Sequence, residues 1–387
     1  MSDTHVSRRD FLAQSAAIGA GALLTIGAPG FGHAARTMPA VKLGKTGEMV
    51  PTLGFGSAFN LTPQLVRIAL AEGITFIDTA EGYNNGNSER SIGEILTQLG
   101  RRKDCFIVTK TGRHAPETLS EKLQGSLERL QTDYVDAFYL HNLGSPDLLD
   151  DTVKAAAEKL KKDKKIRFFG FSSHHRNMIE TMEKAAEVGF VDMIMFKYNF
   201  WDYDNAALNK AIDKCAKANI GLIAMKTQGG AATVPERLEQ FKSKGFNPFQ
   251  AALKAVWADD RIHMAVSEMT TIDQVKENAT AAREKDMGAL ERRQLEDYAA
   301  ANTNLYCRGC GHICESSLNN QVNIADTLRF RLYHQGYGKP EDARRLFHEL
   351  PQSVRNIAGV DFAAAERACP HHLPIGKLMT EAVQLLA

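Results

Sequence analysis

Eight short apolar runs, each followed by an amphipathic helical segment, occupy the chain between residues 53 and 283. The runs, such as 105–110 and 135–141, are apolar at successive positions, as expected of parallel strands buried on both faces. The segments between them place apolar residues at helical spacing, as at Leu123, Leu127 and Leu130. One such helix is expected from about Ser91, with Glu94 three positions later in a capping box. Eight such cycles over roughly 250 residues predict an α/β fold, a (β/α)8 TIM barrel.

An open, doubly wound sheet is the alternative arrangement of alternating strands and helices. The first run, 53–56, is not followed by the Gly-x-Gly-x-x-Gly turn that such a sheet uses for dinucleotides. With a small hairpin at 41–51, the barrel is predicted to span residues 41–300. The pattern then stops, and residues 301–387 are predicted to form a mostly helical extension that carries cysteines.

The first 35 residues carry the marks of an export signal. A twin-arginine motif, Ser7-Arg8-Arg9-Asp10-Phe11-Leu12, precedes a Gly/Ala-rich apolar stretch at 16–28 and small residues around 32–35. The stretch is too short to span a bilayer. Residues 1–35 are therefore predicted to be a twin-arginine signal peptide that directs the protein to the periplasm, either cleaved or kept as a tether. No membrane span is expected in the mature chain.

The overall charge gives no reason to expect a polyanionic partner. The chain has 47 Lys and Arg against 46 Asp and Glu, a formal net charge of +1. Electrostatic attraction to nucleic acid requires a basic surface. Neither nucleic acid nor an anionic membrane is therefore expected as a partner.

Four polar residues stand at or after the ends of three successive predicted strands. Asp78 ends the second strand, Tyr83 follows in its loop, Lys110 ends the third strand, and His141 ends the fourth. In a barrel these ends open on one face, where active sites form. A lysine beside a phenol would lower its pKa, the carboxylate would hold the lysine, and the histidine could orient a carbonyl oxygen. Each residue alone is compatible with ordinary packing, but the four together predict a proton-transfer site.

The chain resembles the aldo-keto reductase superfamily over about residues 41–300. The resemblance implies that Tyr83 is the general acid that protonates a carbonyl while a nicotinamide delivers hydride. Asp78 and Lys110 would tune Tyr83, and His141 would orient a small carbonyl or alcohol substrate. The stretches that carry the resemblance are Leu43-Gly-Lys-Thr-Gly47, Gly54-Phe-Gly56, Phe76-Ile-Asp-Thr-Ala-Glu-Gly-Tyr83, Asn87-Ser-Glu-Arg90, Val108-Thr-Lys110, Tyr139-Leu-His141, Gly170-Phe-Ser172, Met225-Lys226 and Glu277-Asn278.

The resemblance also implies a nucleotide site that departs from the family pattern at its nicotinamide end. Ser172 and Ser173 stand where the family has a Ser-Asn pair for the carboxamide. Met195 replaces a glutamine, whereas Tyr198 matches the pattern. Met225 lies at the position of the ring-stacking residue.

At the phosphate end, residues 226–230 are expected to form the loop over the pyrophosphate, with Lys226, Gln228 and Gly229 among its residues. Glu277 and Asn278 match the family. NADP-dependent members carry a lysine and an arginine for the 2′-phosphate, and alignment places Glu268 and Gln274 there. A carboxylate repels a phosphate and can accept a hydrogen bond from a ribose hydroxyl. The expected cofactor is NAD or NADP, with NAD favoured.

The extension carries four of the six cysteines: Cys307, Cys310, Cys314 and Cys369. Three clustered thiols with a remote Cys-Pro suit one [4Fe–4S] cluster, and the tail resembles that of an aldo-keto reductase subgroup with a ferredoxin-like extension. Zinc on these thiols, with His312, and two disulfides are the alternatives. The other two cysteines, Cys105 and Cys215, lie in apolar contexts and are expected to be buried.

Two functions follow from these features. The first is an exported oxidoreductase that interconverts a carbonyl and an alcohol, with its nicotinamide bound before export or its electrons supplied through the cluster by a redox partner protein. The second is a periplasmic electron-transfer or binding protein on a barrel with a weakened nucleotide site. The intact residues Asp78, Tyr83, Lys110 and His141 favour the first.

Overall fold

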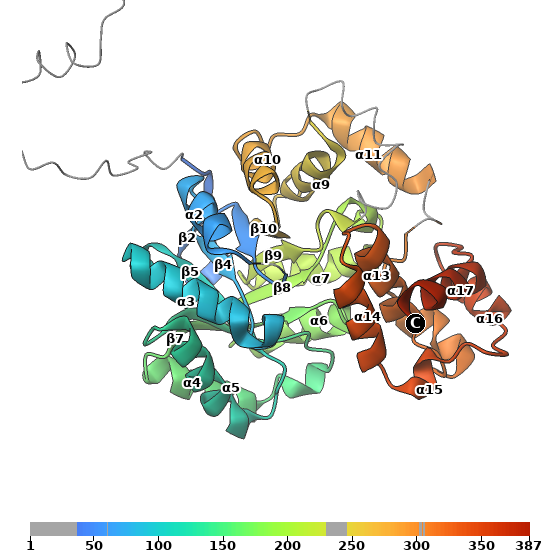
Figure 1. Ribbon diagram of the computed structural model, residues 1–387, viewed down its shortest axis with the longest axis horizontal. Coiled ribbons are helices and arrows are strands. Elements are labelled where there is room, and N and C mark those ends of the chain that lie inside the picture. The colour runs from blue at the N-terminus through green and yellow to red at the C-terminus, as the bar shows by residue number, and fades with distance from the viewer. Residues whose placement is uncertain (1–36, 60, 230–245, 302–303, 305) are drawn as a thin grey trace, which may run out of the picture. The chain divides into compact units, whose positions relative to one another are not determined.

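The computed structural model describes residues 37–59, 61–229, 246–301, 304 and 306–387. The predicted signal peptide at 1–35 and Gly230 of the predicted pyrophosphate loop lie outside these residues, which Figure 1 colours along the chain. No helix within the described ranges has both the length and the apolar character needed to cross a membrane.

Eight parallel strands close into a barrel in the order β10-β3-β4-β5-β6-β7-β8-β9, which confirms the predicted fold. The ring closes where β10 pairs with β3, with Ala265 opposite Leu53 and Glu268 opposite Gly56. The strands are β3 (Leu53–Gly56), β4 (Phe76–Asp78), β5 (Phe106–Thr111), β6 (Val135–Leu140), β7 (Ile166–Ser173), β8 (Met193–Lys197), β9 (Gly221–Met225) and β10 (Met264–Glu268).

The strands are apolar because each has two buried faces. Side chains such as Phe76, Val108 and Met193 pack together in one cluster with the hairpin residues, whereas Ile77 belongs to a larger cluster shared with the surrounding helices. Successive strand residues point to opposite faces, so Asp78 shares the inward face of Phe76. The site residues therefore stand at the mouth of the barrel.

A hairpin covers the other end of the barrel. Strands β1 (Ala40–Lys42) and β2 (Met49–Pro51) pair antiparallel, as predicted. Leu43 and Val50 pack into the inner cluster. The amide of Lys45 donates to the carbonyl of Asn219, just before β9. The end of the barrel that remains available for a site is therefore the one at the carboxyl ends of the strands.

Helices surround the barrel between successive strands (Figure 1). One boundary differs from its prediction: α3, expected from about Ser91 with Glu94 in a capping box, begins at Asn87, because Gly86 adopts a φ of 80° and turns the chain into the helix earlier. The helices are α2 (Pro63–Ala71), α3 (Asn87–Leu99), α4 (Leu119–Leu130), α5 (Asp151–Lys162), α6 (Met178–Val188), α7 (Ala206–Lys217), α9 (Pro248–Trp257) and α10 (Ile272–Arg283).

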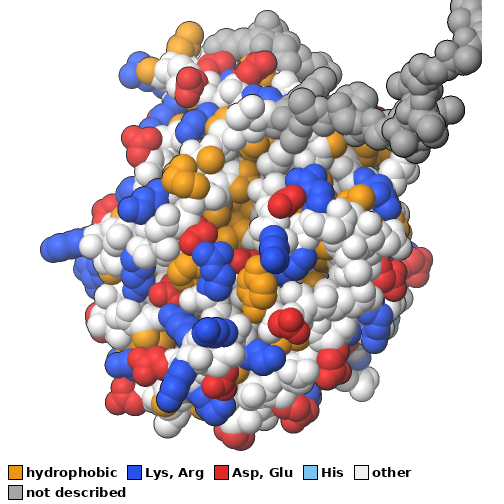
Figure 2. All heavy atoms as spheres, turned by 90° about the vertical axis from the view of Figure 1, so that its left-hand side faces the viewer, with side chains coloured by type: hydrophobic (Ala, Val, Ile, Leu, Met, Phe, Trp, Pro, Cys, Tyr) orange, Lys and Arg blue, Asp and Glu red, His pale blue; other side chains and the backbone are white. Residues whose placement is uncertain are grey.

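Charges of both signs are mixed on the face shown in Figure 2. Lys and Arg side chains alternate with Asp and Glu around a central hollow in which hydrophobic side chains gather. This mixture agrees with the formal net charge of +1.

The chain continues into a helical extension with a core of its own, as predicted. Leu328, Phe347 and Met379 are among the residues buried in that core, together with Cys314 and Cys369. Barrel and extension belong to one compact unit. The helices are α11 (Ala289–Ala301), α12 (Gly311–Cys314), α13 (Ile324–Gln335), α14 (Pro340–Glu349), α15 (Gln352–Arg355), α16 (Ala363–Ala368) and α17 (Ile375–Leu386).

Candidate active site

Lys110 joins the predicted acid–base residues at the mouth of the barrel. Its side chain is 1% exposed, and its Nζ lies 2.6 Å from Oδ1 of Asp78. The same ammonium donates to the phenol oxygen of Tyr83 at 3.3 Å and to the carbonyl of Thr79 at 2.8 Å. The structure therefore brings together the three side chains that were predicted from separate strand ends.

A tight turn after β4 positions Tyr83. It opens a short 3-10 helix, Tyr83–Gly86, in which Asn84 and Asn85 have φ angles of 47° and 52°. Asparagine tolerates this left-handed region better than most residues. The turn folds the phenol back over the barrel.

His141 follows β6 and faces the tyrosine. The two rings lie 5.5 Å apart at an angle of 80°. Burial, together with the positive charges of Lys110 and Lys226, lowers the pKa of His141 to about 3. At neutral pH this side chain is a neutral imidazole. It can donate a hydrogen bond to a carbonyl oxygen and does not change its protonation state near neutral pH.

The predicted lowering of the pKa of Tyr83 is wrong for the protein without cofactor. Burial is the largest cause that holds this pKa well above its ordinary value, and the negative charge of Asp78 raises it further. Lys110, in turn, has its own pKa lowered by burial. Tyr83 is consequently a protonated phenol, the form that a general acid requires.

A cavity of about 310 Å³ opens beside the tyrosine and runs toward β10. It collects most of the residues predicted for catalysis and nucleotide binding. Those that line it are Asp78, Tyr83, Met225, Lys226, Gln228, Glu268, Gln274, Glu277 and Asn278.

Hydrogen bonds preorganise the far end of this cavity. Gln228 donates to Asn278 at 3.0 Å and accepts from Ser267 at 2.6 Å. Glu268 accepts from the backbone amides of Ala58 and Phe59, both at 2.8 Å. Burial raises the pKa of Glu268 to about 7, although the two amides oppose the shift. The carboxylate predicted to meet the ribose is thus held in place by the loop after β3.

Four predicted cofactor residues have side chains or positions outside this cavity. Ser172 accepts from the amide of Asn142, and Ser173 donates to the carbonyl of Leu143, so both hydroxyls tie neighbouring loops together. The phenol of Tyr198 donates to Asp259 at 2.7 Å, within the packing of the barrel. Gly229 lies close to the phenol oxygens of Tyr306 and Tyr337 in the extension.

The extension supplies site residues that the sequence did not indicate. Lys226 donates to the phenol of Tyr333, on α13, at 2.6 Å. Tyr333 stacks on Tyr337 with ring centroids 5.5 Å apart, and Tyr337 and Lys339 line the cavity. Two tyrosines four residues apart, Tyr333 on α13 and Tyr337 just after its end, were a visible signal, but nothing in the sequence placed that helix over the barrel.

The profile of the Aldo/keto reductase family matches residues 55–292 of the chain. The chain belongs to the aldo/keto reductase family. The matched region holds the four residues predicted to transfer the proton and ends within α11, before the cysteines.

Relatives and solved structures agree with this membership. L-galactose dehydrogenase from Arabidopsis thaliana is 28% identical over 294 residues, which are 67% of this chain and 92% of that enzyme. The aldo-keto reductase AKR11C1 from Bacillus halodurans has a TM-score of 0.59 and 25% identity, with 67% of this chain and 96% of that one covered. An aldo-keto reductase from Klebsiella pneumoniae solved with NADPH gives 0.57 and 25%, with 68% and 95% covered. This aldo/keto reductase is therefore an NAD(P)-dependent oxidoreductase.

The four cysteines of the extension lie near one another in this aldo/keto reductase. Cys314 and Cys369 are buried, and Cys307 and Cys310 are partly buried. Burial, with smaller contributions from the neighbouring Cys310 and Cys369, raises the pKa of Cys307 to about 12. None of the described cysteines forms a disulfide, contrary to that alternative. The described residues contain no group of three or more His, Cys, Asp or Glu already arranged to hold a metal ion.

Proposed function

We propose that this aldo/keto reductase reduces an aldehyde or ketone to an alcohol, or runs the reverse reaction, with Tyr83 as the general acid and base. One observation carries the proposal: the Lys110 ammonium lies 3.3 Å from the Tyr83 phenol and 2.6 Å from Asp78. A bound nicotinamide would supply or accept the hydride. Residues of the 310 Å³ cavity, among them Met225, Gln228 and Asn278, would hold it.

Tyr83 gives its proton to the carbonyl oxygen as the alcohol forms. The phenolate left behind is stabilised by the ammonium of Lys110, which Asp78 holds in place. His141, neutral because of its lowered pKa, hydrogen-bonds the same oxygen and orients it. A single donor of this kind contributes about 100-fold or more to rate.

Replacement of Tyr83 by Phe tests the proposal. The variant keeps the ring and removes the proton, so turnover of simple aldehydes should fall by about 100-fold or more. Tyr134→Phe is the matched control, because Tyr134 lies outside the cavity against Arg102. Full activity of Tyr83→Phe would refute the role of Tyr83, whereas absence of carbonyl turnover in the wild type would favour an electron-transfer or binding protein.

NAD is the proposed cofactor in preference to NADP. Glu268 and Gln274 line the cavity where a 2′-phosphate would be expected to bind, and Glu268 is held there by two backbone amides. A carboxylate repels a phosphate. NADH should therefore bind about tenfold or more tightly than NADPH. Tighter binding of NADPH in calorimetric titrations would contradict this preference.

One [4Fe–4S] cluster is proposed for the extension. Cys307, Cys310, Cys314 and Cys369 would hold it, because thiols are the ligands that such clusters require and all four are unpaired here. Lys197 adds positive charge near Cys307 and Cys310, which favours thiolates. A bound cluster would supply one-electron transfer to or from a redox partner protein. Iron and acid-labile sulfide in anaerobically purified protein would support the cluster; zinc without sulfide would replace it.

Export by the twin-arginine route is proposed from the motif Ser7-Arg8-Arg9-Asp10-Phe11-Leu12. This route carries folded proteins, so both nucleotide and metal could be loaded before export. Replacing Arg8 and Arg9 together by Lys should leave the protein in the cytoplasmic fraction. Unchanged periplasmic recovery of that variant would exclude the route.

A further inference from the structure

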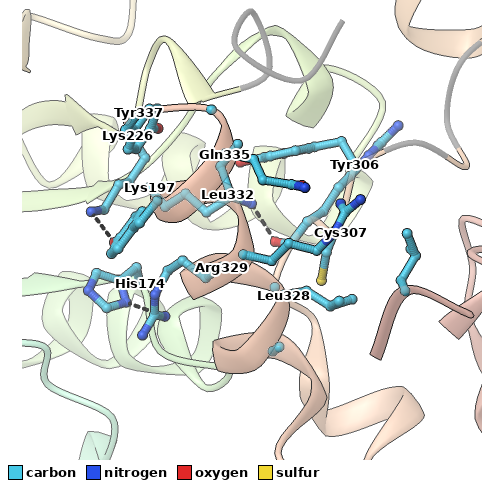
Figure 3. A pocket seen from close by; sticks show the side chains of 17 residues that line it. His174, Lys197, Lys226, Tyr306, Cys307, Leu328, Arg329, Leu332, Gln335 and Tyr337 are labelled. Atoms are coloured by element: carbon cyan, nitrogen blue, oxygen red, sulfur yellow. Dashed lines mark hydrogen bonds between the residues drawn. The ribbon is translucent and has the colours of Figure 1, made fainter. Parts of the chain in front are cut away.

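A second cavity, of about 200 Å³, lies between the strand ends of the barrel and helix α13 of the extension (Figure 3). It shares Lys226, Gly336 and Tyr337 with the nucleotide cavity. The two spaces therefore meet at these residues. The proposed reaction uses the first cavity and leaves the second without a role.

The wall of the second cavity is cationic. Among the described residues that line it there is no Asp or Glu, whereas five side chains carry positive charge: Lys197, Lys226, Arg308, Arg329 and Arg331. Four of these have carboxylate partners, but each partner stands outside the lining; they are Asp202, Asp204, Asp326 and Glu381. Lys226 instead donates to the phenol of Tyr333. An anion in the cavity would therefore meet positive groups first.

Two neutral groups on the wall respond to this positive potential. The pKa of His174 is held well below its ordinary value, first by burial and then by Arg329 and Lys226. Burial would raise the pKa of Tyr333, yet Lys226 and Arg329 outweigh it and the pKa is lowered. Figure 3 shows His174 against Arg329 and Lys226 reaching the neighbouring phenol. The field is thus strong enough to reverse the effect of burial on one side chain.

The second cavity lies close to the candidate catalytic residues. Residues proposed to hold the nucleotide, such as Gln228 and Asn278, line only the first cavity. His174, in contrast, interacts electrostatically with His141, and Tyr333 does so with Tyr83. A molecule with its carbonyl at Tyr83 can extend past Lys226 into the cationic space.

We propose that this second cavity holds the anionic end of the substrate, a carboxylate or a phosphate, through Arg329 and Lys226. The substrate class is then a carbonyl compound or alcohol that carries an oxyanion group. This inference rests on the proposed function, which it makes more specific. It also gives the extension a part in substrate selection, because α13 contributes Arg329.

Matched pairs of substrates test the inference on the full chain. Succinic semialdehyde is compared with butanal, and glyceraldehyde 3-phosphate with glyceraldehyde, by kcat/KM. The charged member of at least one pair should be preferred by about tenfold or more, mainly through KM, since a charged hydrogen bond in a sheltered site is worth at least that factor. The two pairs distinguish carboxylate from phosphate.

The variant Arg329→Met should reduce this preference by about tenfold. Its former partner Asp326 is 33% exposed and stays solvated, so the fold should survive. Arg345→Met is the matched control, since Arg345 lies on α14 outside the cavity and pairs with Glu349. Calorimetric titration with succinate and with inorganic phosphate, for wild type and Arg329→Met, measures anion binding without turnover.

The outcomes distinguish a failure of the anion-binding inference from a failure of the proposed carbonyl reaction. Equal kcat/KM for charged and neutral members in the wild type, with no anion binding, overturns the inference and leaves the proposed reaction standing. A preference lost equally in Arg345→Met also overturns it, because the effect would then come from overall charge. Weaker NADH binding by Arg329→Met with an unchanged preference would assign the cavity to the nucleotide. Anion binding lost in Arg329→Met, in a protein without carbonyl turnover, would support the cavity and contradict the reaction.

Discussion

The ammonium of Lys226 lies 2.6 Å from the phenol oxygen of Tyr333, 107 residues further along the chain. The first residue follows the seventh barrel strand, and the second lies on α13 of the extension. Phe59 packs edge-on against the same tyrosine, with ring centroids 6.1 Å apart. The extension is thereby fastened to the mouth of the barrel, near Tyr83.

Tyr333→Phe should destabilise this junction. The change removes one hydrogen bond and leaves the partly buried ammonium of Lys226 without its phenol partner, which costs about 1–3 kcal/mol. Urea unfolding, followed by circular dichroism, measures the loss. Tyr134→Phe, outside the junction, should lie within about 0.5 kcal/mol of wild type. Equal stability of the two variants would show that the Lys226–Tyr333 contact contributes nothing.

Lys110→Met should lower both activity and stability. Asp78, itself 4% exposed, would be left as a buried charge without its 2.6 Å partner. Breaking a buried ion pair from one side costs about 3–5 kcal/mol. Adding Asp78→Asn to Lys110→Met should recover much of the unfolding free energy but none of the turnover. Recovery of turnover in the double variant would contradict the role of Lys110.

The rate of carbonyl reduction should be flat with pH from about pH 6 to about pH 9 when both substrates are saturating. Tyr83 remains the protonated acid over this range because its pKa is raised. His141, with its pKa lowered to about 3, stays neutral and does not titrate there. Alcohol oxidation, which needs the phenolate, should instead rise with pH. An inflection of kcat for reduction near the ordinary pKa of histidine would show that His141 is exposed to solvent during turnover.

Discrimination against NADPH should increase as the pH rises through about 7. Below that pKa Glu268 is largely protonated and repels a 2′-phosphate weakly; above it the carboxylate is charged. The ratio of dissociation constants for NADPH and NADH, measured on both sides of this pKa, tests the prediction. Glu268→Gln, which keeps the shape and never ionises, should remove the pH dependence. A ratio that does not change with pH in the wild type would place the phosphate away from Glu268.

The hairpin beneath the barrel offers a test on two glycines. Both have positive φ, 48° at Gly44 and 75° at Gly47. A Cβ at Gly44 would come within 2.6 Å of the Asn219 carbonyl, whereas one at Gly47 would meet nothing within 4 Å. Gly47→Ala should cost about 1–2 kcal/mol for its backbone alone. Gly44→Ala should cost more, and equal unfolding free energies for the two variants would mean that the hairpin moves away without penalty.

Local patterns were enough to predict the barrel. Strand β6 was predicted at residues 135–141 and lies at Val135–Leu140, because a strand buried on both faces is mostly apolar. The start of α3 was missed by four residues, since a capping box at Ser91 is a weaker constraint than the left-handed turn at Gly86.

The same reasoning predicted which residues meet at the carboxyl ends of the strands. Asp78, Lys110 and His141 come together because parallel strands in a barrel send all their carboxyl ends to one face. This reasoning could not predict the direction in which each side chain points at the mouth of the barrel. Tyr198 and Ser173, which were predicted to contact the cofactor, use their hydroxyls within the fold, where they donate to Asp259 and to the carbonyl of Leu143.

By itself, then, the sequence predicted the barrel through the periodicity of its apolar runs, and its motifs resembled those of the family. Strand order also predicted that the candidate proton-transferring residues would meet at one face of the barrel. Only the tertiary structure determined the pKa values of the site residues and showed that the extension forms part of the site. Burial sets the pKa values of Tyr83, His141 and Glu268, and burial is a property of the whole packed molecule. The contact of Lys226 with Tyr333 joins residues so far apart in the chain that no local pattern could have predicted it.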